Sequence, residues 1–360
     1  MRKVALLLSM LPLTAWAAPP VLPPFLRPDQ QGASCRNKIQ RVPWGHLTSA
    51  ERSSYIRATV CLTRRPATHG IPEARTLWDE LQYIHIYQSA YWDQVLDLPN
   101  LRGASVFDPR TGFGGDGVGP DLCVADGPFA NLRLRFTEDL ATTQSGYCLS
   151  RNMSECLFAN TATANVLNCQ RAGSFEEAWN CLEAKPHIAG HWGIGGTVSL
   201  TFSTIHLLSL LSYLTKLPCM SNPHTSPGDP LFFLHHTWID LQWWRWQSQD
   251  PSTRLSQVGG VNVPSGNGGP PQGAGGGGGS PGAVPSPDGA CLPPLGGAGG
   301  AALGHGEGGL VLNTVLTDYF DDGGAVTTLN HRLWSAGILP NATIGDVMDL
   351  GGSLVCAEYV

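Results

Sequence analysis

Two segments rich in histidine constrain this chain more than any other feature, because they can bring several imidazoles to one point. The segment KPHIAGHWGIGG, which starts at Lys185, places His187 and His191 four residues apart. On one helix, residues at this spacing share a face, so both rings can reach a single metal ion. Imidazole ligands suit copper or zinc. The sequence therefore predicts a metal site on a helix through these two histidines.

A second helix is predicted to supply a third ligand. In SPGDPLFFLHHTWID, Asp229 is predicted to cap a helix whose first position is Pro230, and His235 and His236 follow on its second turn. The periodicity favours His236 as the ligand, and we expect its stripe to face the bundle interior. His235 is then expected to support the site without binding the metal. The stripe of His236 contains Phe232, Ile239 or Asp240, and Trp243. Three ligands leave coordination positions open, as catalytic metal sites require.

The same segments resemble the second copper-binding region, CuB, of tyrosinases and catechol oxidases. The resemblance implies that His187, His191 and His236 bind one copper, and Asp240 matches the family's aspartate four residues after the last ligand. It extends to CLTRRPATHGIPEARTLWDELQYIHI, to YWDQVLDLPNLRGASVFDPRTGFGGDGVGP and to the ending ATIGDVMDLGGSLVC, which resemble the short secreted fungal members. We therefore expect a mainly α fold, a helical bundle around a copper site with long disulfide-bearing loops and few short strands.

The resemblance also implies a function. The family oxidises phenols with dioxygen, so a copper oxidoreductase that converts o-diphenols to o-quinones is expected, with a small phenol and dioxygen as partners. Ile188 stands where family members have an asparagine that helps hold a proton-accepting water, and its side chain can neither donate nor accept a hydrogen bond. Activity on monophenols is therefore expected to be weak. Phe232 and Phe233 are candidates for the substrate pocket, although apolar helix positions usually belong to the core.

The first copper site of the family, CuA, is incomplete in this sequence. Residues 72–88 are predicted to form a helix with Leu77, Leu81 and His85 on one face, and the resemblance identifies His85 as the first CuA histidine. The other two have no counterpart, because the chain passes directly from Ser89 to AYWD. The intact family site holds two coppers, whereas this chain is expected to hold one. Two upstream histidines are not expected to take the missing places: His46 and His69.

An apolar stretch interrupts the CuB region between residues 198 and 219. Its first 18 residues nearly reach the length of a membrane span. We reject a span, because His191 and His236 flank the stretch and must approach one copper. Joining Thr197 to Met220 restores a continuous family-like sequence, so a retained intron here and a lost exon after Ser89 are our hypothesis, which sequencing of the transcript tests. Neither His206 nor His224 is then a ligand.

The first 17 residues have the features of a signal peptide: basic residues, an apolar run and an A-x-A site. The chain is therefore expected to be secreted, with glycosylation acceptors at Asn152 and Asn341. Its ten cysteines are expected to form disulfides in that environment. Cys35 with Cys61 is the first pairing to consider. Four more leave three pairings open: Cys148, Cys156, Cys169 and Cys181.

The domain boundaries follow from composition. Residues 18–257 are predicted to form the copper-binding domain, with CuB at 187–240; residues 258–309 form a Gly/Pro-rich flexible linker and 310–360 a closing segment. No Gly-Lys-Ser/Thr follows the glycines, so the linker is not a phosphate site. A formal net charge of −6 leaves no basic surface for nucleic acid.

Two other readings of the histidines remain. The chain is either a non-catalytic secreted protein with one copper at CuB, or a defective isoform of an active oxidase. A zinc hydrolase built on the same three histidines is disfavoured, because no glutamate follows His187 in the way that an HExxH motif requires.

Overall fold

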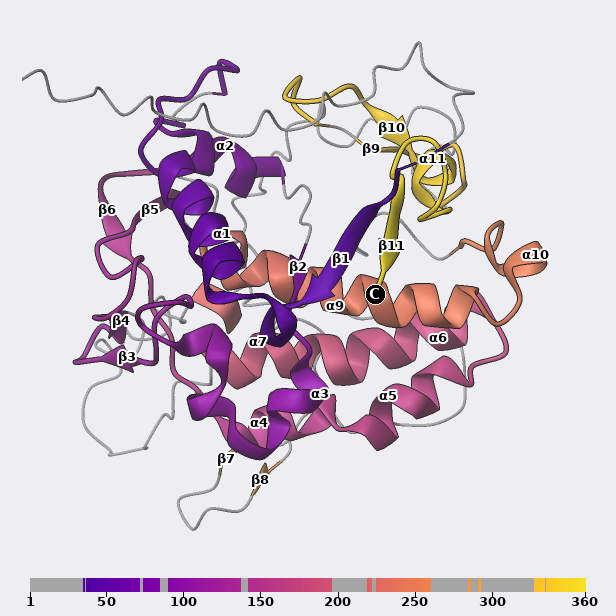
Figure 1. Ribbon diagram of the computed structural model, residues 1–360, viewed down its shortest axis with the longest axis horizontal. Coiled ribbons are helices and arrows are strands. Elements are labelled where there is room, and N and C mark those ends of the chain that lie inside the picture. Colours follow the sequence, from indigo (N-terminus) through magenta and orange to yellow (C-terminus); the bar gives the residue numbers. More distant parts are fainter. Residues whose placement is uncertain are drawn as a thin grey trace, which may run out of the picture.

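The computed structural model describes residues 35, 37–71, 74–84, 90–136, 142–195, 219–221, 225–259, 284–285, 291–292, 327–333 and 335–360. Helices dominate this part of the chain, and its strands are short (Figure 1). The predicted mainly α fold is confirmed.

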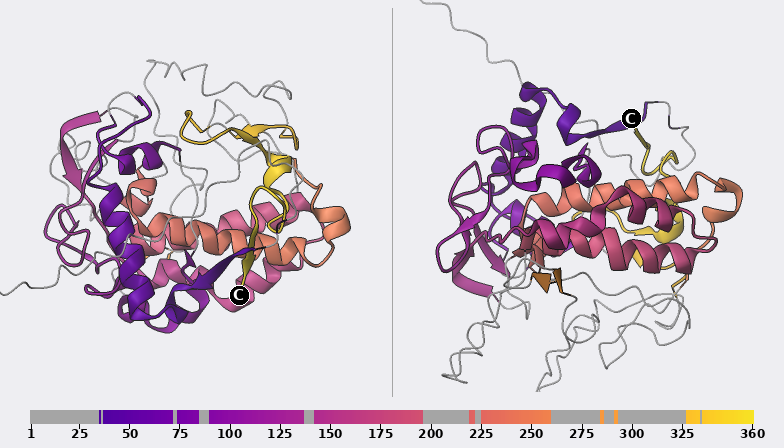
Figure 2. Two further views of the ribbon diagram at one scale, coloured as in Figure 1. Left: turned by 45° about the horizontal axis from the view of Figure 1, so that its top comes forward. Right: turned by 90° about the horizontal axis from the view of Figure 1, so that it is seen from below.

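Helix α9 (Leu231–Gln247) is the longest of the described elements and carries the His235–His236 pair. Helices α5 (Thr163–Gln170) and α6 (Phe175–Leu182) pack against it and run alongside it in both views of Figure 2. Helix α7 (Ile188–Gly195) continues directly from a π-helical turn over Glu183–His187 and packs against α4 (Glu155–Phe158). The two histidine segments therefore lie on neighbouring helices, as the sequence predicts.

Local capping explains where α9 and α2 begin. Helix α9 starts at Leu231, one residue after the predicted position, and Asp229 Oδ1 accepts a hydrogen bond from Leu231 N at 2.9 Å. Helix α2 (Leu77–Ile84) starts five residues later than predicted, because the Asp79 carboxylate accepts from the backbone N–H groups of Arg75 and Thr76, both at 2.9 Å.

The buried face of α2 also differs from the predicted one. The fully buried side chains are Trp78, Asp79, Glu80 and Gln82, whereas Leu77 and Leu81 are only partly buried. Two of the buried side chains are carboxylates that bind backbone N–H groups of the preceding loop, which a pattern of apolar residues does not show. The remaining helices are α1 (Ser49–Leu62), α3 (Gln94–Asp97), α10 (Pro251–Arg254) and α11 (Ile344–Val347).

A three-stranded parallel sheet joins distant parts of the chain. Strand β1 (Ile39–Pro43) lies between β11 (Ala357–Tyr359) and β2 (Ala90–Tyr91), with Ile39 opposite Ala357. The other strands form two-stranded pairs: β3 (Gly117–Val118) with β4 (Cys123–Val124), β5 (Arg133–Phe136) with β6 (Thr142–Cys148), β7 (Val284–Pro285) with β8 (Cys291–Leu292), and β9 (Arg332–Leu333) with β10 (Ala342–Thr343).

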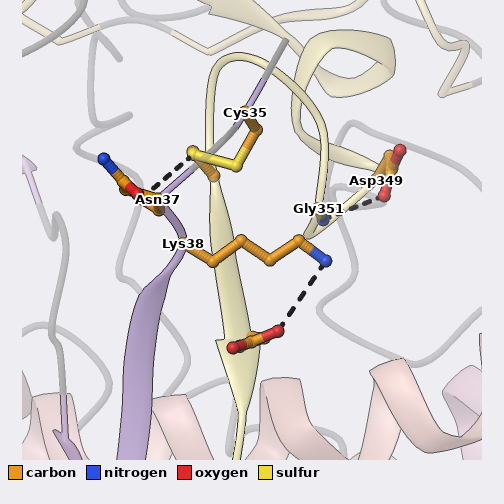
Figure 3. Close-up of a disulfide and its surroundings, with 7 residues drawn as sticks. Cys35, Asn37, Lys38, Asp349 and Gly351 are labelled. Atoms are coloured by element: carbon orange, nitrogen blue, oxygen red, sulfur yellow. Dashed lines mark hydrogen bonds and ion pairs between the residues drawn. A yellow bond between two sulfur atoms is a disulfide. The ribbon is translucent and has the colours of Figure 1, made fainter.

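The predicted pairing of Cys35 with Cys61 is wrong. Cys35 forms a disulfide with Cys356, and their Cα atoms are 5.4 Å apart (Figure 3). The reason is the pairing of β1 with β11, which brings residues 321 positions apart side by side. Lys38 and Glu358 form an ion pair at 3.8 Å across the same two strands. Cys61 is an exposed free thiol.

Two further disulfides link Cys123 to Cys148 and Cys169 to Cys181. Only the second joins two members of the predicted group of four, because Cys148 pairs with a cysteine outside that group. The Cys169–Cys181 bond ties α5 to α6, the two helices that pack beside α9. Buried aromatic side chains fill the core around these elements, among them Trp44, Trp78, Trp92, Trp238 and Trp246.

Several predictions concern residues outside the described part of the chain. These are the signal peptide, His85, nearly all of the 198–219 stretch and most of the linker, and they stay predictions. Among the described helices, none has the length and apolar composition of a membrane span.

Candidate metal centre

Three histidine nitrogens converge between α7 and α9. His191 Nε2 lies 3.1 Å from His187 Nε2 and 3.1 Å from His236 Nε2. Two nitrogens at this separation can bind one ion at about 2.05 Å each, with an angle of roughly 98° between the bonds. His235 is the fourth member of the group, and one ligand atom from each of the four lies within 4.8 Å of the others. This group could hold a metal ion.

The ring of His191 is oriented by the main chain. Its Nδ1 lies 2.8 Å from the carbonyl oxygen of Met220, so Nδ1–H donates there and Nε2 keeps its lone pair toward the cluster. Burial, and then the neighbouring His187, lower the pKa of His191 to about 3. Neutral imidazole is the form that binds a metal.

Met220 belongs to a short 3-10 turn, Cys219–Ser221, which packs on the end of α7. The contact is close, because a Cβ atom added to Gly195 would lie 2.4 Å from Ser221 N. The chain therefore leaves α7 at Gly195 and returns to the same place at Ser221. This arrangement suits the hypothesis that residues 198–219 interrupt a shorter connection.

His187 closes the π-helical turn that precedes α7, and Pro186 lies inside that turn. Single π turns within helices are frequent at functional sites. The carboxylate of Glu183, one turn earlier, lies 2.8 Å from His187 Nδ1 but out of line with a ring N–H. An acidic group beside the outer nitrogen is a common arrangement behind a metal-binding histidine.

The predicted inward stripe of α9 is wrong. His236, Ile239, Asp240 and Trp243 are only partly buried, whereas His235 is fully buried. The most deeply buried side chains of this helix are those of Leu231, Leu234, His235, Trp238, Leu241, Gln242 and Trp246. The reason is that this apolar set packs into the core, which leaves the stripe of His236 at the accessible edge, where a reactive metal needs it.

Asp229 and Asp240, which the sequence already indicates, fix the start and the middle of α9 through distant partners that it does not indicate. Arg151 and Asp229 form a two-pronged ion pair at 2.8 and 2.9 Å, and both side chains have no exposed surface. Asp240 accepts from Arg41 Nη1 and from the Tyr359 hydroxyl, each at 2.5 Å, so β1 and β11 hold the helix one turn beyond His236.

Phe232 and Phe233 have different positions. The ring of Phe232 lies 4.0 Å from that of His236 and 5.8 Å from that of His191, so it forms an apolar wall beside the cluster. Phe233 packs against Trp78 at 5.4 Å, and both phenylalanines belong to the buried core. Ile188 directly follows His187 and is partly buried.

The donor set of this group fits copper. All four donors are imidazoles, which suit copper and zinc and not the hard cations that prefer oxygen. His191 Nε2 presents its lone pair to Nε2 of both His187 and His236, and an ion among the three nitrogens could bind all of them once His187 and His236 are in the tautomer with Nε2 unprotonated. Two of the histidines predicted not to be ligands lie elsewhere in the described part of the chain: His46 is exposed, and His69 binds Glu80 at 2.9 Å. His206 and His224 lie outside the described residues.

Comparison with known proteins agrees with this site. Residues 75–249 match the model of the common central domain of tyrosinase, a range that includes all four histidines. The chain carries a tyrosinase-family domain. Tyrosinase family membership implies copper, which agrees with the cluster.

Relatives of this tyrosinase-family chain are distant. It is 28% identical over 286 residues to tyrosinase-like protein phomQ1 of Diaporthe leptostromiformis, a match that covers 64% of this chain and 66% of that protein. It is 26% identical over 276 residues to tyrosinase ustQ of Aspergillus flavus, covering 64% and 69%. The chain thus spans about two thirds of these relatives. A mutant polyphenol oxidase from Thermothelomyces thermophila shares the fold with a TM-score of 0.58 at 19% identity, over 90% of this chain and 89% of that one.

Proposed function

We propose that this chain is an exported copper oxidoreductase that oxidises o-diphenols to o-quinones with dioxygen and acts weakly on monophenols. The observation that carries the proposal is the convergence of three imidazole nitrogens within a tyrosinase-family domain, with His191 Nε2 lying 3.1 Å from Nε2 of both His187 and His236. Copper bound there would supply electron transfer between the phenol and dioxygen. Each o-diphenol loses two electrons and two protons. One dioxygen takes up the four electrons and four protons that two o-diphenols release, and forms two waters.

The residues around the cluster suit an aromatic substrate. The part-buried His236 gives access to the site, and the buried ring of Phe232 packs beside it as part of the apolar wall of the site. Ile188 supplies no proton acceptor at the position after His187. Hydroxylation of a monophenol needs such an acceptor, because the phenol must lose its proton on binding. An o-diphenol is more acidic and already carries both oxygens, so the missing proton acceptor affects its oxidation less.

Export is supported by the disulfides, which persist in oxidising compartments. Of the two glycosylation acceptors, Asn341 is exposed and Asn152 is partly buried.

Metal analysis tests the copper content. Among the described residues, the group of four histidines is the one cluster able to hold a metal, so at most one tightly bound copper per chain is expected. Two tightly held coppers would contradict this expectation. With one copper, oxidation of o-diphenols by the chain as written should be absent or very weak, because the family's chemistry uses two. One copper with no oxidation at all would favour a non-catalytic copper protein.

Restoring a complete CuA segment after Ser89 and removing residues 198–219 tests the substrate preference. The restored chain should oxidise an o-diphenol rapidly and the matching monophenol slowly. In that background Ile188→Asn should raise the monophenol rate, and Ile188→Leu, which keeps the position apolar, should not. Rapid monophenol turnover with Ile188 in place, unchanged by asparagine, would refute the proposed role of this position.

A further inference from the structure

His235 forms a buried wall behind the three converging nitrogens. Its side chain has no exposed surface, and its ring lies edge to face with that of His191 at 4.7 Å and nearly parallel to that of His187 at 5.5 Å. Two of the proposed ligands therefore rest against this buried ring.

One side chain from a third element holds this ring. Gln94 is the first residue of α3 and is also fully buried. Its Nε2 lies 2.6 Å from His235 Nδ1, so the amide N–H donates to the ring nitrogen. Gln94 Oε1 and His235 Nε2 have no aligned hydrogen-bond partner. Burying unmatched polar atoms is unfavourable, so the contact between Gln94 and His235 is kept against an opposing cost.

The backbone of α7 lies against the same edge of the ring. A Cβ atom added to Gly190 would lie 2.2 Å from Cε1 and 2.4 Å from Nδ1 of His235, and 2.9 Å from Gln94 Nε2. No larger residue fits without displacing one of the two side chains. The hydrogen bond between Gln94 and His235 is therefore packed directly on α7, the helix that carries His191.

We propose that Gln94 is a positioning residue of the metal centre, which acts by fixing the His235 ring against His187 and His191. The inference rests on the proposed binding of copper by this cluster. Metal ligands must be held within about 0.5 Å and 10–20° of their working geometry by the groups around them. Loss of a group that orients the ligands typically lowers metal affinity 10–100-fold.

The test replaces Gln94 by methionine, which keeps the length of the side chain and removes both hydrogen-bonding groups. The copper dissociation constant should rise 10–100-fold, and the paramagnetic resonance spectrum of bound Cu(II) should change, because the ligand rings lose their support. Gln94→Asn, which shortens the side chain by one methylene and so withdraws the amide from His235, should have the same effect. It replaces the methionine variant in the test if that variant does not fold.

Gln242→Met is the matched control. Gln242 is fully buried on α9 as well, and it binds Gln170 and the Trp238 carbonyl. It lies six residues beyond His236, about 9 Å along the helix axis. This variant should lower the denaturant midpoint of the metal-free protein and leave the copper dissociation constant within twofold.

A double-mutant cycle separates positioning from general destabilisation. If Gln94 acts through His235, Gln94→Met should have no further effect on copper affinity in a His235→Phe background. An equal loss in both backgrounds, or a dissociation constant and spectrum unchanged by Gln94→Met and Gln94→Asn, would overturn the inference while leaving the proposed function intact. A natural chain that binds no copper would overturn both.

Discussion

The buried ion pair at the start of α9 gives the sharpest prediction for stability. Arg151→Met leaves the Asp229 carboxylate, which has no exposed surface, without its partner. It also removes the donor to the carbonyl oxygens of Gly114 and Gly115, at 2.6 and 3.2 Å. Breaking one side of such a pair costs about 3–5 kcal/mol of unfolding free energy. For a domain of this size, this corresponds to a fall in melting temperature of roughly 6–20 °C.

The measurement is thermal and denaturant unfolding of the metal-free protein, followed by circular dichroism. Arg102→Met is the matched control, because Arg102 also pairs with carboxylates, those of Asp116 and Glu155, but half of its side chain is exposed. Exposed pairs of this kind contribute about 0–1 kcal/mol, so the control should change little.

The double variant Arg151→Met with Asp229→Asn distinguishes an orphaned charge from lost packing. It should be more stable than Arg151→Met alone, because asparagine removes the uncompensated charge and can still accept from Leu231 N. A cost below about 1 kcal/mol for Arg151→Met, or a double variant no more stable than the single one, would refute this account.

Three further predictions concern the site and its surroundings. His236→Ala should abolish retention of copper after dialysis while His235→Ala only weakens it; equal loss would show that the histidine register was misread. Gly190→Ala should lower the unfolding free energy by about 1–3 kcal/mol and weaken copper binding, because the added methyl group would lie 2.2 Å from the His235 ring; an unchanged melting temperature would contradict this. The pKa of Glu80 is below its usual value, because hydrogen bonds from the His69 side chain and from the His69 and Thr68 backbone outweigh the effect of burial, which alone would raise it. The stabilisation from Glu80 is therefore complete above about pH 4.5 and is lost as the pH falls through the lower pKa that Glu80 has in the folded protein. The unfolding free energy should fall with pH in that window, and less steeply in Glu80→Gln. Parallel pH profiles of the two proteins would show that Glu80 does not contribute.

The sequence by itself determined the local features of the centre. The spacing of His187 and His191 put both rings on one helical face, and Asp229 marked the start of α9 to within one residue. Both results rest on contacts between residues at most four positions apart, which follow from the geometry of a single helix. The resemblance to tyrosinases came from the same short segments, and the family comparison agrees with it.

The tertiary structure alone decided which side of α9 is buried and which distant groups meet there. Nothing local indicated that His235 would be the buried imidazole, that Gln94 would reach it from α3, or that Met220 would bind His191. The same holds for Cys35, whose partner was set by the pairing of the first strand with the last. Helix periodicity gives an angle around one axis, whereas burial and partners depend on how separate elements pack, and residues 141 or 321 positions apart leave no local pattern that records their contact.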